Sequence, residues 1–176
     1  NKKEIEKKIF FLYKKNLFFL KTFDIETKLK EINFIESFEI KKIYPNIIKI
    51  KISEKKPIAV IQNKKLKSYF TNKGDTINYI YLEQFNDLPL VYGDKQSFKF
   101  LINDLKNIKF PINKIKTFYL FETSRWDLIT RDNITLKLPI KNYKKSLINF
   151  LNLKNKSSFK KYKIFDYRIS GQLILK

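Results

Sequence analysis

The stretch Tyr44-Pro45-Asn46-Ile47-Ile48-Lys49-Ile50-Lys51-Ile52-Ser53-Glu54 decides how the chain folds. Over residues 48–53 an isoleucine alternates with a lysine or a serine, the pattern of a strand with one buried and one solvated face. Pro45-Asn46 is a turn signal, because proline fixes its own φ and asparagine tolerates tight backbone conformations. Residues 38–40 alternate in the same way. These features predict a β-hairpin that spans about residues 35–54.

Two helices are predicted before this hairpin, at residues 3–15 and 23–32. Apolar residues recur at helical spacing in both, and they are Ile5, Ile9 and Leu12 in the first helix and Ile25, Leu29 and Ile32 in the second. Thr22 is the expected N-cap of the second helix. Pro57 is expected to end the hairpin ladder, because it has no N–H to donate. Residues 1–56 therefore read helix–helix–strand–strand.

The rest of the chain is rich in predicted strands. Short apolar or alternating runs predict strands at residues 58–61, 68–70, 77–81 and 115–121. Helical spacing of apolar residues predicts helices at residues 95–108 and 141–152. Arg125-Trp126-Asp127-Leu128 opens another strand, which turns at Arg131-Asp132-Asn133. Two further apolar runs end the chain, Tyr162-Lys163-Ile164-Phe165 and Leu173-Ile174-Leu175.

Composition excludes several classes of function. The chain of 176 residues has no cysteine and no histidine, which removes disulfides, thiolate nucleophiles, Cys/His metal sites and histidine acid–base catalysis. It also has no Gly-rich phosphate loop and no nucleophile elbow, so no cofactor is expected. The longest apolar runs are far shorter than the ~20 residues that a membrane-spanning helix needs.

The net charge of +21 raises the question of nucleic-acid binding. The 38 basic residues include only three arginines, at positions 125, 131 and 168. Arginine is the preferred reader of phosphate and guanine, because its guanidinium is a planar, bidentate fork. The chain is also rich in lysine, asparagine and isoleucine, as an AT-rich genome would dictate. A solvated lysine coat is therefore the favoured interpretation, and nucleic acid is not an expected partner.

The order of the motifs resembles the extracytoplasmic region of a bacterial cell division family, FtsQ, which is called DivIB in Gram-positive bacteria. In that family a small POTRA domain ends in a strand, a proline, a second strand and Glu-Arg-x-Pro-Ala/Ile-Ala. The following domain carries Arg-Arg-Trp-x-Leu and, near its end, Asp-Leu-Arg. Here a serine at position 124 replaces the first arginine. The matching positions are Pro45, Glu54, Pro57, Arg125, Trp126 and Asp166.

The resemblance implies an α+β fold with two domains. Residues 1–56 correspond to a POTRA domain, whose order is strand–helix–helix–strand–strand, without its first strand. One edge of its sheet is then expected to be unpaired or covered by something else. Residues 57–176 correspond to the family's β domain, a mixed β structure with two helices. In the family a single transmembrane helix precedes the POTRA domain, so the implied protein is anchored in the inner membrane and faces the periplasm at the division septum.

The resemblance also implies a non-catalytic scaffold with protein partners. In the family this region holds FtsB and FtsL and helps to control septal peptidoglycan synthesis, and FtsB contacts the end of the β domain. A last strand exposes N–H and C=O groups along a free edge, to which a partner strand can add. Other divisome membrane proteins are expected to contact the POTRA domain. The expected partner-binding residues are Tyr167, Arg168, Ile169, Ser170, Gly171, Gln172, Leu173, Ile174 and Leu175.

The prominent single residues also have plain structural interpretations. Trp126 lies in an alternating strand, where a single tryptophan is more often core than a partner anchor. Asp166 and Arg168 lie two residues apart, so they share one face of a strand and are expected to form a structural ion pair. Asp166 is a lone carboxylate, and it lacks the second titratable group that acid–base catalysis requires.

Two alternative functions were weighed against the division scaffold. One is a POTRA-bearing component of outer-membrane assembly or secretion, which has the hairpin but neither the Arg-Trp-x-Leu block nor the Asp-x-Arg ending. The other is a basic nucleic-acid-binding protein, against which the ratio of lysine to arginine argues. An enzyme comes after both.

Overall fold

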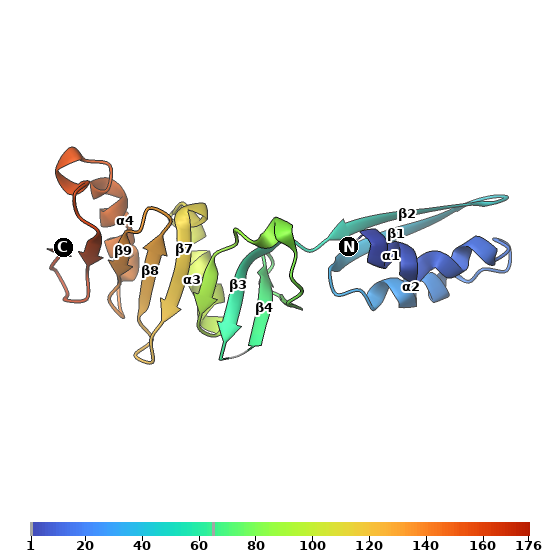
Figure 1. Ribbon diagram of the computed structural model, residues 1–176, viewed down its shortest axis with the longest axis horizontal. Coiled ribbons are helices and arrows are strands. Elements are labelled where there is room, and N and C mark those ends of the chain that lie inside the picture. The colour runs from blue at the N-terminus through green and yellow to red at the C-terminus, as the bar shows by residue number, and fades with distance from the viewer. Residues whose placement is uncertain (1, 65) are drawn as a thin grey trace. The chain divides into compact units, whose positions relative to one another are not determined.

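The computed structural model describes residues 2–64 and 66–176 and has the α+β fold that the sequence predicts. The chain separates into two compact units, Asn1–Lys56 and Pro57–Lys176. Figure 1 shows the first unit as two helical segments beside a long hairpin, and the second as a broad sheet with helices.

The first unit follows the predicted order, with a shorter first helix. It consists of α1 (Lys2–Ile9), the 3₁₀ helix η1 (Phe10–Lys14), α2 (Thr22–Lys30), β1 (Ile35–Ile43) and β2 (Ile47–Glu54). The predicted single helix over residues 3–15 is therefore wrong beyond Ile9, since aromatic residues at 10, 11 and 13 have low helix propensity and the last turns tighten. The predicted N-cap is also wrong, because Lys21 precedes the helix and makes no side-chain cap hydrogen bond.

The hairpin of the first unit is the one that the sequence predicts. β1 and β2 pair antiparallel, with Ile40 opposite Ile50 and Ile43 opposite Ile47. Alternate apolar side chains of the hairpin pack against a core of buried residues, namely Leu17, Leu20, Ile25, Leu29, Ile32 and Ile35. The sheet has two strands within the described residues, so neither strand has a second neighbour in that part of the chain.

The second unit is built on a mixed sheet, which has nine strands among the described residues, in the order β11-β10-β9-β8-β7-β6-β3-β4-β5. Its strands are β3 (Pro57–Asn63), β4 (Leu66–Thr71), β5 (Thr76–Asn78), β6 (Leu90–Tyr92), β7 (Ile115–Leu120), β8 (Trp126–Thr130), β9 (Thr135–Lys137), β10 (Ile164–Asp166) and β11 (Ile174–Leu175). Its helices are α3 (Lys95–Asn107) and α4 (Tyr143–Leu153), with 3₁₀ turns η2 (Glu83–Phe85), η3 (Ile112–Lys114) and η4 (Ser157–Phe159). Pro57 opens β3 after β2 has ended at Glu54, and a strand's first residue is a position where proline is tolerated.

Helices α3 and α4 cover one face of this sheet. The register places Val91, Phe118 and Leu128 side by side on β6, β7 and β8, and all three are buried under the helices. Phe98 of α3 packs edge-on against Phe70 and Phe118, with ring centroids 5.0 and 5.2 Å away. Trp126 lies 6.2 Å from Phe98 and is 6% exposed, so it is a core residue, as predicted. The opposite face of the sheet carries the polar residues described below.

The packing around Phe98 gives a stability prediction. Replacing the fully buried ring by alanine, Phe98→Ala, is expected to lower the free energy of unfolding by about 3–5 kcal/mol, because a large cavity remains in the core. Urea unfolding followed by the fluorescence of Trp126, the one tryptophan of the chain, reports on this unit. Phe100→Ala on the same helix is the matched control, since Phe100 is 62% exposed and its loss should cost at most about 0.5 kcal/mol. Equal effects of the two changes would contradict this core.

Candidate functional site: the β11 edge

The residues expected to bind a partner form the last hairpin of the sheet. β10 and β11 pair antiparallel, with Phe165 opposite Leu175 and Asp166 opposite Ile174. β10 pairs in parallel with β9 on its other side, whereas β11 is the terminal strand of the sheet. β11 (Ile174–Leu175) therefore lies at an edge of the sheet, whereas the N–H of Tyr167, at the start of the expected segment, still donates to the Lys137 carbonyl of β9. We call residues 173–176 the β11 edge.

Hydrogen bonding divides the backbone groups of the β11 edge into two sets. Lys176 donates its N–H to the Ile164 carbonyl at 3.1 Å and accepts the Ile164 N–H at 2.9 Å. In an antiparallel ladder, residues with both groups turned toward one neighbour recur every second position. The backbone N–H and C=O groups of Lys176 and Ile174 therefore face β10. Those of Leu173 and Leu175 point away from the sheet. These outward groups are the ones that an added strand can use.

A tight turn joins the two strands of this hairpin. The N–H of Gln172 donates to the carbonyl of Ile169 at 3.1 Å, and Gly171 has φ of +75°. These features match a type II turn, in which the third residue needs positive φ and is usually glycine. A Cβ atom at Gly171 would meet nothing within 4 Å, so its glycine is required by the backbone conformation and not by lack of space.

The side chains of the expected partner-binding segment fall into two groups. Tyr167 is buried, and its hydroxyl donates to Asn149 Oδ1 at 2.9 Å. Burial raises the pKa of Tyr167 to about 12. Leu173 and Leu175 are half-buried against the core. The exposed members are Arg168, Ile169, Ser170, Gly171, Gln172 and Ile174. Tyr167 thus supports the hairpin from inside and offers no side-chain surface to a partner.

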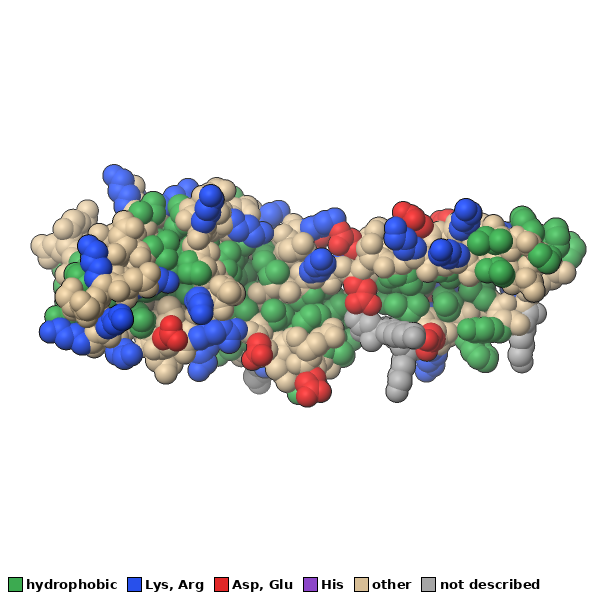
Figure 2. Space-filling model, turned by 90° about the horizontal axis from the view of Figure 1, so that it is seen from above, with side chains coloured by type: hydrophobic (Ala, Val, Ile, Leu, Met, Phe, Trp, Pro, Cys, Tyr) green, Lys and Arg blue, Asp and Glu red, His purple; other side chains and the backbone are tan. Residues whose placement is uncertain are grey.

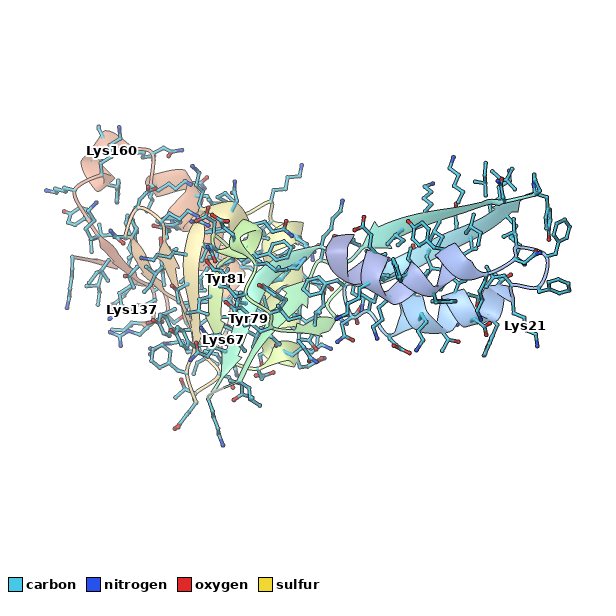
Figure 3. The ribbon with its side chains drawn as sticks, turned by 45° about the vertical axis from the view of Figure 1, so that its right-hand side comes forward. Lys21, Lys67, Tyr79, Tyr81, Lys137 and Lys160 are labelled. Atoms are coloured by element: carbon cyan, nitrogen blue, oxygen red, sulfur yellow. The ribbon has the colours of Figure 1, made fainter. Side chains whose placement is uncertain are left out.

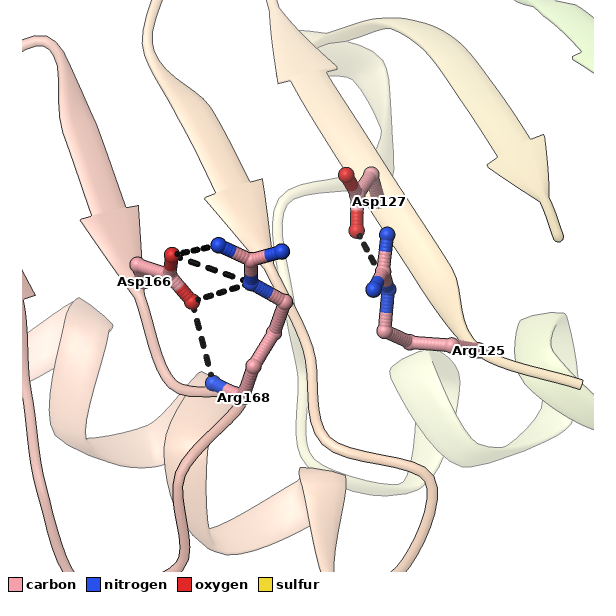
Figure 4. Close-up of polar contacts among 4 residues, drawn as sticks. All are labelled: Arg125, Asp127, Asp166 and Arg168. Carbon is pink, nitrogen blue, oxygen red and sulfur yellow. Dashed lines mark hydrogen bonds and ion pairs between the residues drawn. The ribbon is translucent and has the colours of Figure 1, made fainter. Parts of the chain in front are cut away.

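A row of charged residues crosses the open face of the sheet and ends at β11. The register places Asp127 of β8 opposite Lys137 of β9, and Lys137 opposite Asp166 of β10. Asp166 in turn lies opposite Ile174. Arg125 and Arg168 reach onto the same row, and Figure 4 shows each arginine against the aspartate two residues away in its own segment. Nothing in the sequence marks Lys137, because only the strand register brings it to this row.

Asp166 fixes the exit of the chain from β10. Its carboxylate accepts hydrogen bonds from Arg168 Nη2 at 2.6 Å, from Arg168 Nε at 2.9 and 3.0 Å, and from the Arg168 backbone N–H at 3.1 Å (Figure 4). The hydrogen bonds from Arg168 hold the pKa of Asp166 below its usual range. This is the ion pair that the sequence predicted, and it anchors the first residues of the loop that leads to β11.

Asp127 carries a second, weaker pair at the start of β8. Arg125 Nε donates to Asp127 Oδ1 at 3.2 Å, and the guanidinium lies 4.3 Å from the centre of the Phe121 ring. Burial raises the pKa of Asp127, although Arg125 and Lys137 both act to lower it. The two aspartates of the row therefore have pKa shifts of opposite sign, because burial dominates at Asp127 and the hydrogen bonds from Arg168 dominate at Asp166.

The remaining motif positions lie away from this edge. Pro45 follows a cis peptide bond in the turn between β1 and β2. Glu54 ends β2 and Pro57 begins β3. Within the described residues, no cluster of three acidic side chains is arranged to hold a metal ion. No helix in that part of the chain is both long and apolar enough to cross a bilayer.

Comparison with known proteins identifies relatives of both units. A family profile described as "Cell division protein FtsQ/DivIB, C-terminal" matches residues 59–168, and one described as "POTRA domain, FtsQ-type" matches residues 1–55. The cell division protein FtsQ of Rickettsia bellii is 31% identical over 157 residues, which are 87% of this chain and 58% of that protein. FtsQ of Agrobacterium fabrum is 26% identical over 125 residues, which are 68% of this chain and 38% of that protein.

The chain spans 58–59% of the length of the Rickettsia relatives that it matches. Among solved structures, the major extracytoplasmic domain of DivIB from Geobacillus stearothermophilus shares 13% sequence identity and a TM-score of 0.36. That likeness covers 58% of this chain and 92% of the other, and it is too low for structural detail to be transferred.

The opposite pKa shifts of the two aspartates give a pH prediction. Asp166→Asn is expected to lower the free energy of unfolding at neutral pH by about 1–2 kcal/mol, since charge-assisted hydrogen bonds to Arg168 are lost. The folded pKa of Asp166 lies below its unfolded value, so this advantage of the native protein is present at neutral pH. It should disappear as the pH falls from about 4 through the folded pKa.

Asp127→Asn is the matched control for this prediction. The folded pKa of Asp127 is raised, so its charge opposes folding at neutral pH and the penalty is relieved as the pH falls. The asparagine variant should therefore be as stable as the native protein at neutral pH or more stable. Urea titrations of the three proteins at neutral and acid pH, followed by Trp126 fluorescence, separate these effects. A loss in Asp166→Asn that does not depend on pH would contradict the ion-pair assignment.

Proposed function

Since the chain belongs to the FtsQ/DivIB family of bacterial cell division proteins, we propose that it is a non-catalytic scaffold that binds an FtsB-like partner at the β11 edge. The proposal is carried by the backbone N–H and C=O groups of Leu173 and Leu175, which the strand register turns away from β10. A strand that pairs with them would extend the sheet by one strand without changing its existing ladder.

The chemistry around the edge defines the partner segment. Ile169 and Ile174 are exposed apolar side chains, 52% and 38% exposed, beside the outward backbone groups. Main-chain pairing supplies affinity that is independent of sequence, and alternate side chains of the added strand then contact this apolar surface. Lys163, Arg168 and Lys176 are also exposed near the edge. Their charge favours a partner strand with acidic residues, because opposite charges across an interface fix register and speed association.

The rest of the proposed role follows from the family. We infer that FtsL is held through FtsB, that the assembly helps to control septal peptidoglycan synthesis, and that this region lies in the periplasm of a membrane-anchored protein at the septum. Other membrane proteins of the division machinery are proposed partners of residues 1–56. The row of Asp127, Lys137 and Asp166 has a structural part in this proposal, since these residues lie on the strands that carry the edge.

The proposal predicts different results for proline at neighbouring positions of β11. Leu175→Pro and Leu173→Pro each remove an outward N–H donor, so binding of an FtsB segment should fall by at least an order of magnitude, roughly the loss of a ladder hydrogen bond plus a steric clash. The fold should persist, because proline is tolerated on an edge where its missing N–H faces solvent. Isothermal titration calorimetry with an FtsB peptide measures the affinity, and circular dichroism checks the fold.

Ile174→Pro is the contrasting variant. Its N–H faces β10, so proline there should disturb the β10–β11 pairing itself and lower stability as well as binding. Lys49→Glu and Lys51→Glu, on the hairpin of the first unit, should leave the affinity for the peptide unchanged. Native affinity in well-folded Leu173→Pro and Leu175→Pro variants would refute strand addition at this edge.

A further inference from the structure

Large aromatic side chains are exposed at one end of the first unit. Tyr13, Phe19 and Phe23 are 82%, 86% and 70% exposed. Figure 2 shows hydrophobic side chains gathered over the right-hand end of the first unit, where the β1–β2 turn and the η1 segment lie. We call the following exposed residues the aromatic tip: Phe10, Tyr13, Phe18, Phe19, Phe23 and Tyr44.

Four rings of the tip form two contacting pairs, and one ring of each pair lies beside a common groove. Phe10 and Tyr13 have ring centroids 5.7 Å apart, and Phe18 and Tyr44 have centroids 4.9 Å apart. A groove of about 890 Å³ has Tyr13, Phe18 and Ile47 of β2 among its lining residues. Rings from the first helical segment, the following loop and the hairpin turn thus meet at one place.

The fold holds these rings outward. Leu17 and Leu20 of the loop are buried, 6% and 3% exposed, which leaves Phe18 and Phe19 between them turned to the surface. The Phe18 N–H donates to Asn16 Oδ1 at 2.9 Å. Lys42 of β1 donates to the carbonyl oxygens of Leu17, at 3.4 Å, and of Leu20. The loop is therefore fastened to the hairpin by its backbone while its phenylalanines remain in solvent.

Lysines outnumber acidic residues around the tip. Residues 9–23 and 41–49 together contain six lysines, at positions 14, 15, 21, 41, 42 and 49, and no aspartate or glutamate. Figure 3 shows Lys21 at this end of the unit. The first carboxylate beyond these segments is Asp24, in the first turn of α2. Exposed aromatic rings are thus combined with an excess of lysines, and Asp24, next to Phe23, is the acidic residue beside the tip.

We propose that the aromatic tip docks onto the surface of a lipid bilayer that carries anionic headgroups. Aromatic side chains favour the boundary between headgroups and acyl chains, and lysines beside them are attracted to anionic lipid. The rings project from three separate segments, and a bilayer can accept them all without a matching shape. A protein hot spot, by contrast, is usually a packed pocket surrounded by residues that exclude water.

Vesicle binding by the chain of residues 1–176 tests this proposal, which is independent of the proposed partner site at β11. The native chain should co-sediment with vesicles of phosphatidylcholine plus phosphatidylglycerol, and much less with phosphatidylcholine alone. Phe19→Ser combined with Phe23→Ser should weaken binding by roughly tenfold or more, because two rings no longer enter the interface. Lys15→Gln and Lys21→Gln should each weaken it about fivefold.

Matched variants of the second unit serve as controls. Phe100→Ser removes a ring of similar exposure, and Lys145→Gln removes an exposed lysine, so neither should change vesicle binding. Binding of the FtsB peptide should be native in all tip variants, which separates failure here from failure of the scaffold proposal. The proposal is overturned if the folded chain does not bind anionic vesicles. It is equally overturned if the double variant Phe19→Ser, Phe23→Ser binds them as well as the Phe100→Ser variant does. It is also overturned if the tip mediates self-association in analytical ultracentrifugation without any vesicle binding.

Discussion

An open β-sheet must end, and the backbone N–H and C=O groups of its last strand then need water or a partner. This constraint shapes the second unit at both ends of its sheet. The terminal strands β5 and β11 are short, with three and two residues, which limits uncontrolled pairing with other chains. At β11 the remaining outward groups belong to Leu173 and Leu175, and their half-buried side chains fix the strand against the core. If a strand adds here as proposed, an edge held in this way needs little further ordering of the protein on binding.

The three arginines show how the chain divides its basic residues into two kinds. Arg125 and Arg168 pair with Asp127 and Asp166 on the sheet. Arg131 donates to the backbone carbonyls of Asn113 at 2.9 Å and Asp87 at 2.5 Å, and thereby joins the β8–β9 turn to two distant loops. Each arginine thus makes defined structural contacts within the second unit. The ion pairs that lysines make in the first unit are exposed and contribute little to stability. The excess charge therefore lies on flexible lysines, which do not read bases.

Local patterns in the sequence predict the local structure, but they do not predict which distant segments pair. The hairpin over residues 35–54 was predictable, because alternation and its turn are contained in one short stretch. The pairing of β9 with β10 was not, since α4 separates these strands and nothing in either marks its neighbour. Lys137 consequently looked like one lysine among many, although the register sets it between Asp127 and Asp166.

The sequence also could not predict which side chains of the loop over residues 17–20 face the core, and the physical reason is different. Leu17, Phe18, Phe19 and Leu20 have similar hydropathy, so composition cannot tell which of them face the core. Backbone hydrogen bonds decide it, because Lys42 holds the carbonyls of Leu17 and Leu20 from a strand that follows more than 20 residues later.

The two proposed contacts, at the β11 edge and at the aromatic tip, would rest on different interactions, and salt should distinguish them. Main-chain pairing at β11 depends on short, directed hydrogen bonds that salt barely screens. Attraction of the tip's lysines to a charged surface acts over longer distances and is screened within a Debye length of about 8 Å at physiological ionic strength. Added salt should weaken the contact of the tip with lipid much more than the pairing at β11. Because the two contacts rest on different interactions, conditions that release one of them need not disturb the other.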